Sequence, residues 1–175
     1  MDPSVYSFVL IDDKGKNFEK VGDVFYLPHN SEFKIVFHNR SDRRANVEFV
    51  LDGAVIGEFR SNPHSNIKLE RPVNKTKVFK FVSVNSEEGK QGRLDMAPKL
   101  GTIEIRVDPE QEYNHNIVYE EIDGPASASL SLGGTVLGKY SDQRFTFAEH
   151  IFTTGQIVKL FARMMVKLDV ESLHV

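Results

Sequence analysis

The side chains most often used for acid–base or metal chemistry are dispersed along this chain. Its six histidines are His29, His38, His64, His115, His150 and His174. No two of them have the His-x-His or His-x-x-x-His spacing that places two imidazoles on one side of a strand or helix. They are therefore expected at the surface or at strand ends. Cysteine is absent, which excludes disulfides, thiolate metal sites and a cysteine nucleophile.

Two groups of acidic residues could bind a cation. Asp12 and Asp13, with Asn17 and Glu19, place several oxygens in one turn, but the regular ligand spacing of a calcium loop is missing. A solvated turn is the favoured interpretation there. The second group lies in a polar stretch and comprises Asp108, Glu110, Glu112, Glu120, Glu121 and Asp123. These residues are expected to serve solubility, with a weak cation site or a contact for a basic partner as the alternative.

Motifs for nucleophilic catalysis or phosphate binding are missing. The chain contains no Gly-x-Ser-x-Gly, no phosphate loop and no Gly-x-Gly-x-x-Gly. Glycoside hydrolysis needs two carboxyl groups across a cleft, which the sequence alone does not place. Arg40, Arg43 and Arg44 form a basic turn that could bind an anion, although a solvated hairpin tip is favoured. The sequence thus predicts a protein without catalytic residues, cofactor or metal.

The elements that would position any site are predicted to be strands. Asp52-Gly53 separates two apolar runs, and this dipeptide favours the positive φ angles of a two-residue hairpin turn. About nine or ten strands follow one another at short spacing with turn residues between them, which is typical of a sandwich or jelly roll. The fold prediction is an all-β, antiparallel, jelly-roll-like sandwich, with residues 1–175 forming a single domain.

Period-two alternation marks the residues that should face the core. These are Phe33, Ile35, Phe37, Val47, Phe49, Leu51, Ile67, Leu69, Phe79, Phe81, Ile103, Ile105 and Val107. Residues 156–168 fit either a helix or a strand; the strand is preferred because it places Lys159, Arg163 and Lys167 on one face. Residues 86–99 and 108–125 are predicted to be mobile loops at a contact surface, and Gly133-Gly134 is predicted to be a turn.

Charge and hydropathy narrow the class of partner. The chain carries 22 basic and 25 acidic residues, a formal charge of −3, which argues against a nucleic-acid binder. Its apolar runs are shorter than the roughly 20 residues of a membrane span. The start Met-Asp-Pro-Ser lacks the features of a signal peptide. Neither nucleic-acid binding nor membrane insertion is expected, and the expected location from these features is the cytoplasm.

Two stretches carry a family resemblance. The first joins Asp52-Gly53 to Ile56–Arg60, Ile67–Pro72 and Phe79–Phe81, and the second is Gly134–Phe145. Together they resemble small uncharacterised β proteins of large DNA viruses and some bacteria. The resemblance implies a β-sandwich or jelly roll in a minor capsid or capsid-associated role, and therefore a virion as the other expected location.

The expected function is a non-enzymatic structural or interaction module that forms a homo-oligomer or joins a larger shell. The alternative is a carbohydrate- or ligand-binding sandwich presenting Tyr26, Tyr113, Tyr119 and Tyr140 on an exposed face. For assembly, contacts are predicted within Lys139–Phe145, at Tyr140, Asp142, Gln143 and Arg144. In the alternative interpretation of this segment, Phe145 fills the core and Arg144 is solvated.

Overall fold

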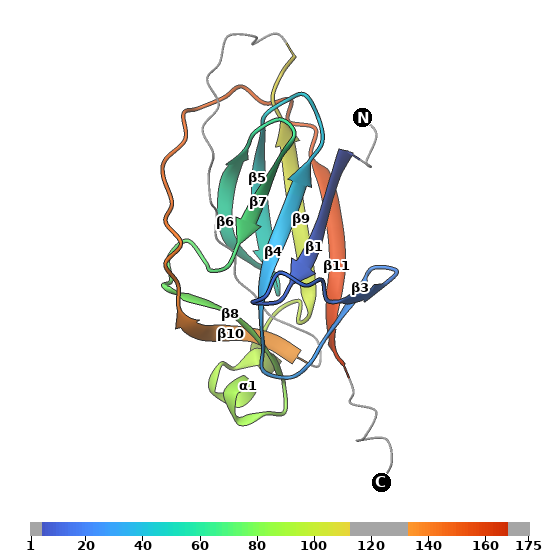
Figure 1. The fold of residues 1–175 in the computed structure, drawn as a ribbon, viewed down its shortest axis with the longest axis vertical. Coiled ribbons are helices and arrows are strands. Elements are labelled where there is room, and N and C mark those ends of the chain that lie inside the picture. Colours follow the sequence, from blue (N-terminus) through green and yellow to red (C-terminus); the bar gives the residue numbers. More distant parts are fainter. Residues whose placement is uncertain (1–4, 113–132, 168–175) are drawn as a thin grey trace.

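A computed structural model describes residues 5–112 and 133–167, which form two β-sheets packed face to face (Figure 1). The first sheet has five strands in the order β1-β4-β8-β10, with β7 pairing β4 beside β8. Their bounds are β1 Tyr6–Ile11, β4 Ser31–Asn39, β7 Ser65–Leu69, β8 Lys77–Ser83 and β10 Gly133–Tyr140.

The second sheet has six strands in the order β2-β3-β11-β9-β5-β6. Their bounds are β2 Glu19–Val21, β3 Val24–Leu27, β5 Ala45–Leu51, β6 Ala54–Ser61, β9 Thr102–Pro109 and β11 Val158–Val166. Pairing is antiparallel throughout except between β3 and β11, which run parallel. The all-β sandwich is therefore confirmed, while this strand order does not confirm the jelly-roll connectivity.

The predicted hairpin is present as β5 and β6. Asp52 and Gly53 adopt φ angles of 54° and 81°, so both central turn residues are left-handed, as a primed turn requires. A bulge between Phe49 and Val50 shifts the register along the hairpin. β6 is the last strand in the order of this sheet, so its outer side is one edge of the six-stranded sheet.

The core lies between the sheets and contains every residue predicted for it. Phenylalanine is prominent in the contact between layers: the rings of Phe37 and Phe49 meet edge-on at 6.4 Å, and those of Phe8 and Phe25 lie 5.8 Å apart. Edge-to-face pairs suit the ring quadrupoles and add to the stabilisation from burial. The alternating residues on the opposite sides of the strands are more exposed.

Three sequence predictions about local structure need comment. The strand preferred for 156–168 is confirmed as β11. The prediction of a turn at Gly133-Gly134 is wrong. These glycines begin β10, where Gly133 pairs with Ser83 and Gly134 pairs with Val82. The loop predicted at 86–99 contains the short helices α1 (Glu87–Gln91) and η2 (Leu94–Met96), with the Ser86 side chain capping α1 through the Gly89 amide at 3.0 Å.

The prediction that a loop begins at residue 108 is wrong, because β9 continues to Pro109. Asp108 and Pro109 are the last residues of β9, and Glu110 is buried beyond it. Residues 113–125 of that prediction lie outside the described residues. Within the described ranges, no helix is long and apolar enough to cross a membrane.

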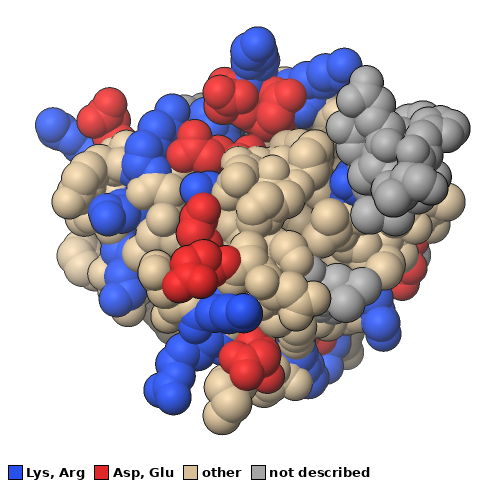
Figure 2. Space-filling view, turned by 90° about the horizontal axis from the view of Figure 1, so that it is seen from below, with Lys and Arg blue, Asp and Glu red and all other residues tan. Residues whose placement is uncertain are grey.

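Charged side chains are mixed on the end of the molecule that carries α1. Figure 2 shows lysine and arginine interspersed with aspartate and glutamate on this end, without a broad basic surface. This view is in keeping with the net charge of −3.

Candidate binding site

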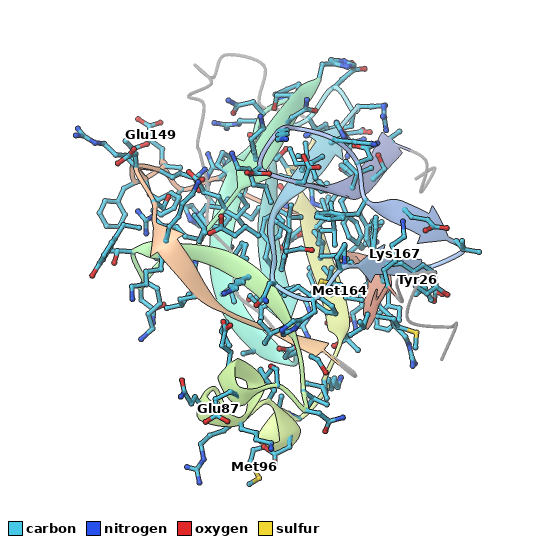
Figure 3. The ribbon with its side chains drawn as sticks, turned by 60° about the horizontal axis from the view of Figure 1, so that its bottom comes forward. Tyr26, Glu87, Met96, Glu149, Met164 and Lys167 are labelled. Atoms are coloured by element: carbon cyan, nitrogen blue, oxygen red, sulfur yellow. The ribbon has the colours of Figure 1, made fainter. Side chains whose placement is uncertain are left out.

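The most unusual feature of the fold is an extended strap, residues 141–157, that joins the two sheets. It contains no helix or strand apart from an isolated bridge at Thr153. In Figure 1 the strap is orange; it leaves β10, rises past the side of the sandwich that carries β6 and β7, and crosses the top to reach β11. Figure 3 labels Glu149 on this strap, at the periphery of the molecule.

The lower end of the strap is fixed to the edge of β7. The Gln143 side-chain amide donates from Nε2 to the Lys68 carbonyl at 2.6 Å and accepts from the Glu70 amide at 3.1 Å. This pair of bonds imitates the pairing of another strand. Unpaired edges invite unwanted strand pairing, so Gln143 protects this part of the edge of the first sheet.

Arg71 fixes the same end from the other direction. Its Nε and Nη2 donate to the Gln143 carbonyl at 3.2 and 2.7 Å. Its guanidinium carbon lies 4.0 Å from the centroid of the Phe145 ring, a cation–π contact. Phe145 in turn packs against the core, 6.0 Å from the Phe59 ring.

The upper end of the strap is fixed to the end of β9. The Asp108 carboxylate accepts from the Thr153 hydroxyl at 2.8 Å and from the Gly155 amide at 2.9 Å. Ile151 is buried, and the Phe152 carbonyl accepts from the Gln111 amide at 2.9 Å. The strap is therefore held at both ends.

Between these two anchors the strap stands away from the sheet and encloses an open cavity of about 520 Å³. Its lining combines the β5–β6 hairpin, Val73 and the strap: Asn46, Glu58, Phe59, Arg60, Val73, Phe145, Thr146, Phe147, Ala148, Glu149 and His150. Ligand-binding pockets commonly enclose about 300–1,000 Å³ and combine apolar walls with a few polar groups. This cavity has both properties.

Arg60 is a buried charged group in the lining: only 8% of it is exposed, whereas Glu58 and Glu149 in the same lining are exposed. Its Nε donates to Asn46 Oδ1 at 3.2 Å, and its Nη2 donates to the Glu149 carbonyl. Burial lowers the pKa of Arg60, and the nearby positive charge of Arg44 lowers it further; Glu110, Glu149 and Glu58 act in the opposite direction. Both atoms that accept from Arg60 are uncharged.

The second buried guanidinium, Arg44, is neutralised by a carboxylate. Its Nε and Nη2 form a two-bond ion pair with Glu110 at 2.8 and 2.6 Å, and both side chains are almost completely buried. The Glu110 amide also donates to the Arg44 carbonyl at 2.9 Å. This ion pair joins the start of β5 to the end of β9.

The predicted interaction residues lie at the lower end of the strap. Tyr140 ends β10 and is 75% exposed, with Lys77 Nζ 5.2 Å from its ring centroid. Asp142 and Arg144 are exposed, whereas Gln143 is occupied by the β7 edge. Phe145 packs on the core, as in the alternative interpretation of this segment. Tyr26 is half-buried in β3, and Tyr113 and Tyr119 lie outside the described residues.

The basic turn is a solvated tip only in part: Arg40 is exposed, Arg43 is half-buried and Arg44 is buried. Arg40 donates to the Ser7 hydroxyl at 2.7 Å, Arg43 pairs with Glu112, and Arg44 is buried against Glu110. The prediction of a solvated tip is wrong for Arg44. Glu110, 66 positions later in the chain, lies at the same end of the sandwich and pairs with it.

In the acidic turn at Asp12-Asp13, the Asp12 carboxylate stabilises the backbone of the turn. Asp12 Oδ1 accepts from the amides of Lys14 and Lys16, each at 2.9 Å, and Gly15 has a φ of 85°. Across 5–112 and 133–167, no group of three or more histidine, aspartate or glutamate residues is arranged to hold a metal ion.

Sequence reasoning missed the cavity residues Arg60, Asn46 and Phe147. Arg60 and Asn46 are ordinary polar positions in alternating strands, and only the pairing of β5 with β6 brings them side by side. The alternation Phe145-Thr146-Phe147 was a usable signal, since it indicates an extended segment with two aromatic side chains on one side.

Comparison with known proteins identifies no relative: no protein family, no curated protein and no solved structure matches the chain.

Proposed function

We propose that this protein is a non-enzymatic, ligand-binding β-sandwich that holds a small organic molecule beneath the strap. The observation that carries the proposal is the open cavity of about 520 Å³ between the strap and β6. The phenylalanines that line it provide apolar contact area, and Arg60 and Asn46 provide polar groups at fixed positions.

The two anchors support a binding role because they fix both ends of the strap that forms one wall of the cavity. Gln143 secures one end of the strap and Asp108 secures the other, so the intervening residues span the space as a fixed wall. A site that is already formed loses less conformational entropy on binding than one that must fold around its ligand.

A matched pair of tryptophan variants tests the proposal. Ala148 lines the cavity and Ala54 lies at the start of β6, and both are exposed. The probe is phenylnaphthylamine, an uncharged molecule that becomes fluorescent in apolar surroundings. We expect saturable binding of one probe per chain, weakened about tenfold or more by Ala148→Trp and unchanged by Ala54→Trp. Equal binding by both variants, or no saturable binding by the parent, would refute the proposed site.

A second candidate function is assembly through the lower end of the strap, the sequence-based expectation. One observation favours it: Tyr140, Asp142 and Arg144 are exposed on a segment whose backbone is held in place by Gln143. Tyrosine and arginine are frequent at the centres of interfaces. Association with a virion stays a prediction that rests on the family resemblance alone.

Light scattering on a sizing column tests the assembly candidate. If the candidate holds, the parent protein is an oligomer, and the double variant Tyr140→Ala/Arg144→Ala is a monomer with an unchanged melting temperature. A parent that is a monomer at all concentrations excludes self-assembly through this segment.

A further inference from the structure

We propose that the ligand under the strap is a monoanion, a carboxylate or similar single-charge acid group on an apolar body, and that Arg60 binds the acid group. This inference rests on the proposed function. It deepens that function by assigning the charge of the ligand and the residue that recognises it.

The guanidinium of Arg60 is only partly used by the protein. Asn46 accepts from Nε and the Glu149 carbonyl accepts from Nη2, which leaves Nη1 without an acceptor among the described residues. Arg60 is one of the residues that line the cavity, and we place the acid group of the ligand at this nitrogen. Arginine presents its N–H groups in a planar fork that suits the two oxygens of a carboxylate.

The direct contacts of Arg60 leave its charge without an ion-pair partner. Glu110 neutralises Arg44 through two hydrogen bonds, whereas no described carboxylate lies within ion-pair distance of Arg60. Arg60 is therefore a positive charge that is about nine-tenths buried and is bonded only to neutral oxygens. Glu58, Glu110 and Glu149 are near enough to raise the pKa of Arg60, but none forms an ion pair with it. A bound acid group would be its first directly bonded ionised partner.

Two further carboxylates limit the ligand to a single charge. Glu58 and Glu149 line the same cavity and are both exposed, so they lie toward solvent. Each repels negative charge on the ligand, and only the charge that pairs with Arg60 is compensated, so a diphosphate or a dicarboxylate would carry an uncompensated second charge. The site thus offers one buried cation surrounded by acidic groups.

The rest of the lining determines the body of the ligand. Phe59, Phe145 and Phe147 line the cavity together with Val73 and Ala148, and the polar Thr146 and His150 lie among them in the lining. Phe147 is fully exposed, with a relative exposure of 102%, so its ring is free to cover a bound molecule. An acid with an aliphatic or aromatic body matches these walls, whereas a sugar, with hydroxyl groups on all sides, leaves polar atoms against them.

A pair of fluorescent probes separates charge from shape. Anilinonaphthalene sulfonate carries one negative charge on nearly the same ring system as uncharged phenylnaphthylamine. We expect Arg60→Gln to weaken binding of the anionic probe about tenfold or more, because a hydrogen bond to a charged group is lost. The uncharged probe should change by less than about twofold, and decanoate, but not decanol, should displace the anionic probe.

Two variants keep the test sharp if Arg60→Gln does not fold. Glu58→Gln and Glu149→Gln remove exposed acidic groups and leave Arg60 and the Glu149 carbonyl in place. Each should tighten binding of the anionic probe by about twofold to threefold and leave the uncharged probe unchanged.

The outcomes distinguish the two proposals. Equal weakening of both probes by Arg60→Gln would show that Arg60 only supports the strap, and the charge assignment would be wrong. Saturable binding of phenylnaphthylamine with no preference for the anion or for decanoate over decanol would also refute the charge assignment and keep the cavity as a binding site. Binding of neither probe to the parent would refute both proposals.

Discussion

The carboxyl group of Asp52 gives the sharpest stability prediction. Only 3% of this residue is exposed, although it lies in the β5–β6 turn, because residues 99–102 cover it. Its Oδ1 accepts from the Gly101 amide at 3.0 Å, and its Oδ2 is buried without a hydrogen-bond partner. Burial raises the pKa of Asp52 to about 11, so the folded protein keeps this carboxyl protonated at neutral pH.

The sign and size of the effect follow from proton linkage. The unfolded chain releases the Asp52 proton near its ordinary pKa of 3.8, whereas the folded chain retains it up to about 11. The contribution of Asp52 to the free energy of unfolding is therefore greatest below pH 3.8, the pKa in the unfolded chain, and it falls as the pH rises toward about 11. Each pH unit costs about 1.4 kcal/mol, so the loss between about pH 4 and about pH 7 is about 4 kcal/mol.

Asp52→Asn removes the titration and keeps the geometry. Asparagine tolerates the positive φ of this turn, and its side-chain oxygen can still accept from the Gly101 amide. We expect the variant to match the parent near pH 4 and to exceed its free energy of unfolding by about 4 kcal/mol near pH 7. Urea denaturation at a series of pH values measures the difference.

Asp13→Asn is the matched control, since Asp13 is an exposed turn residue and its replacement should change the free energy of unfolding little at either pH. A difference between Asp52→Asn and the parent that is the same at every pH would refute the reasoning. So would a variant that is less stable than the parent near pH 7.

Three further substitutions test other parts of the structure. Gln143→Ala removes two hydrogen bonds at the β7 edge and should lower the free energy of unfolding by about 1–2 kcal/mol in urea, with no loss if the edge contact is incidental. Glu110→Gln leaves the buried charge of Arg44 uncompensated and should cost about 3–5 kcal/mol by the same measurement, whereas a change under about 1 kcal/mol would show that water solvates the pair. Gly57→Ala would force a methyl group against Val73 and should cost about 1–3 kcal/mol in thermal unfolding; an unchanged melting temperature would contradict the close packing.

Local sequence patterns predicted the core well because alternation and turn chemistry act over a few residues. Asp52-Gly53 specified its hairpin, and the strand preferred for 156–168 is β11. The pattern failed at Gly133-Gly134, where pairing with β8 outweighs the turn preference of glycine. It also gave no sign that β11 would run parallel to β3, because a strand's direction relative to a distant partner depends on the path of the whole chain.

The candidate site was harder to predict because it is made by contacts between distant parts of the chain. Gln143 binds residues 75 and 73 positions away, and Arg60 meets Glu149 across 89 positions. The sequence drew attention to Lys139–Phe145 for its aromatic and charged residues, and this segment proved to adjoin the cavity lining at Phe145. Arg60 had no distinguishing neighbours in sequence, since its importance comes from burial by the strap.

The central claim is that the space under the strap is a binding site for an acid with an apolar body. The most direct measurement is a titration of the isotope-labelled protein with decanoate, followed by amide chemical-shift changes. The account predicts saturable shifts centred on Phe59, Arg60 and the strap residues Phe145–His150, with Tyr140 unaffected. Shifts that centre on another face, or that never saturate, would contradict it.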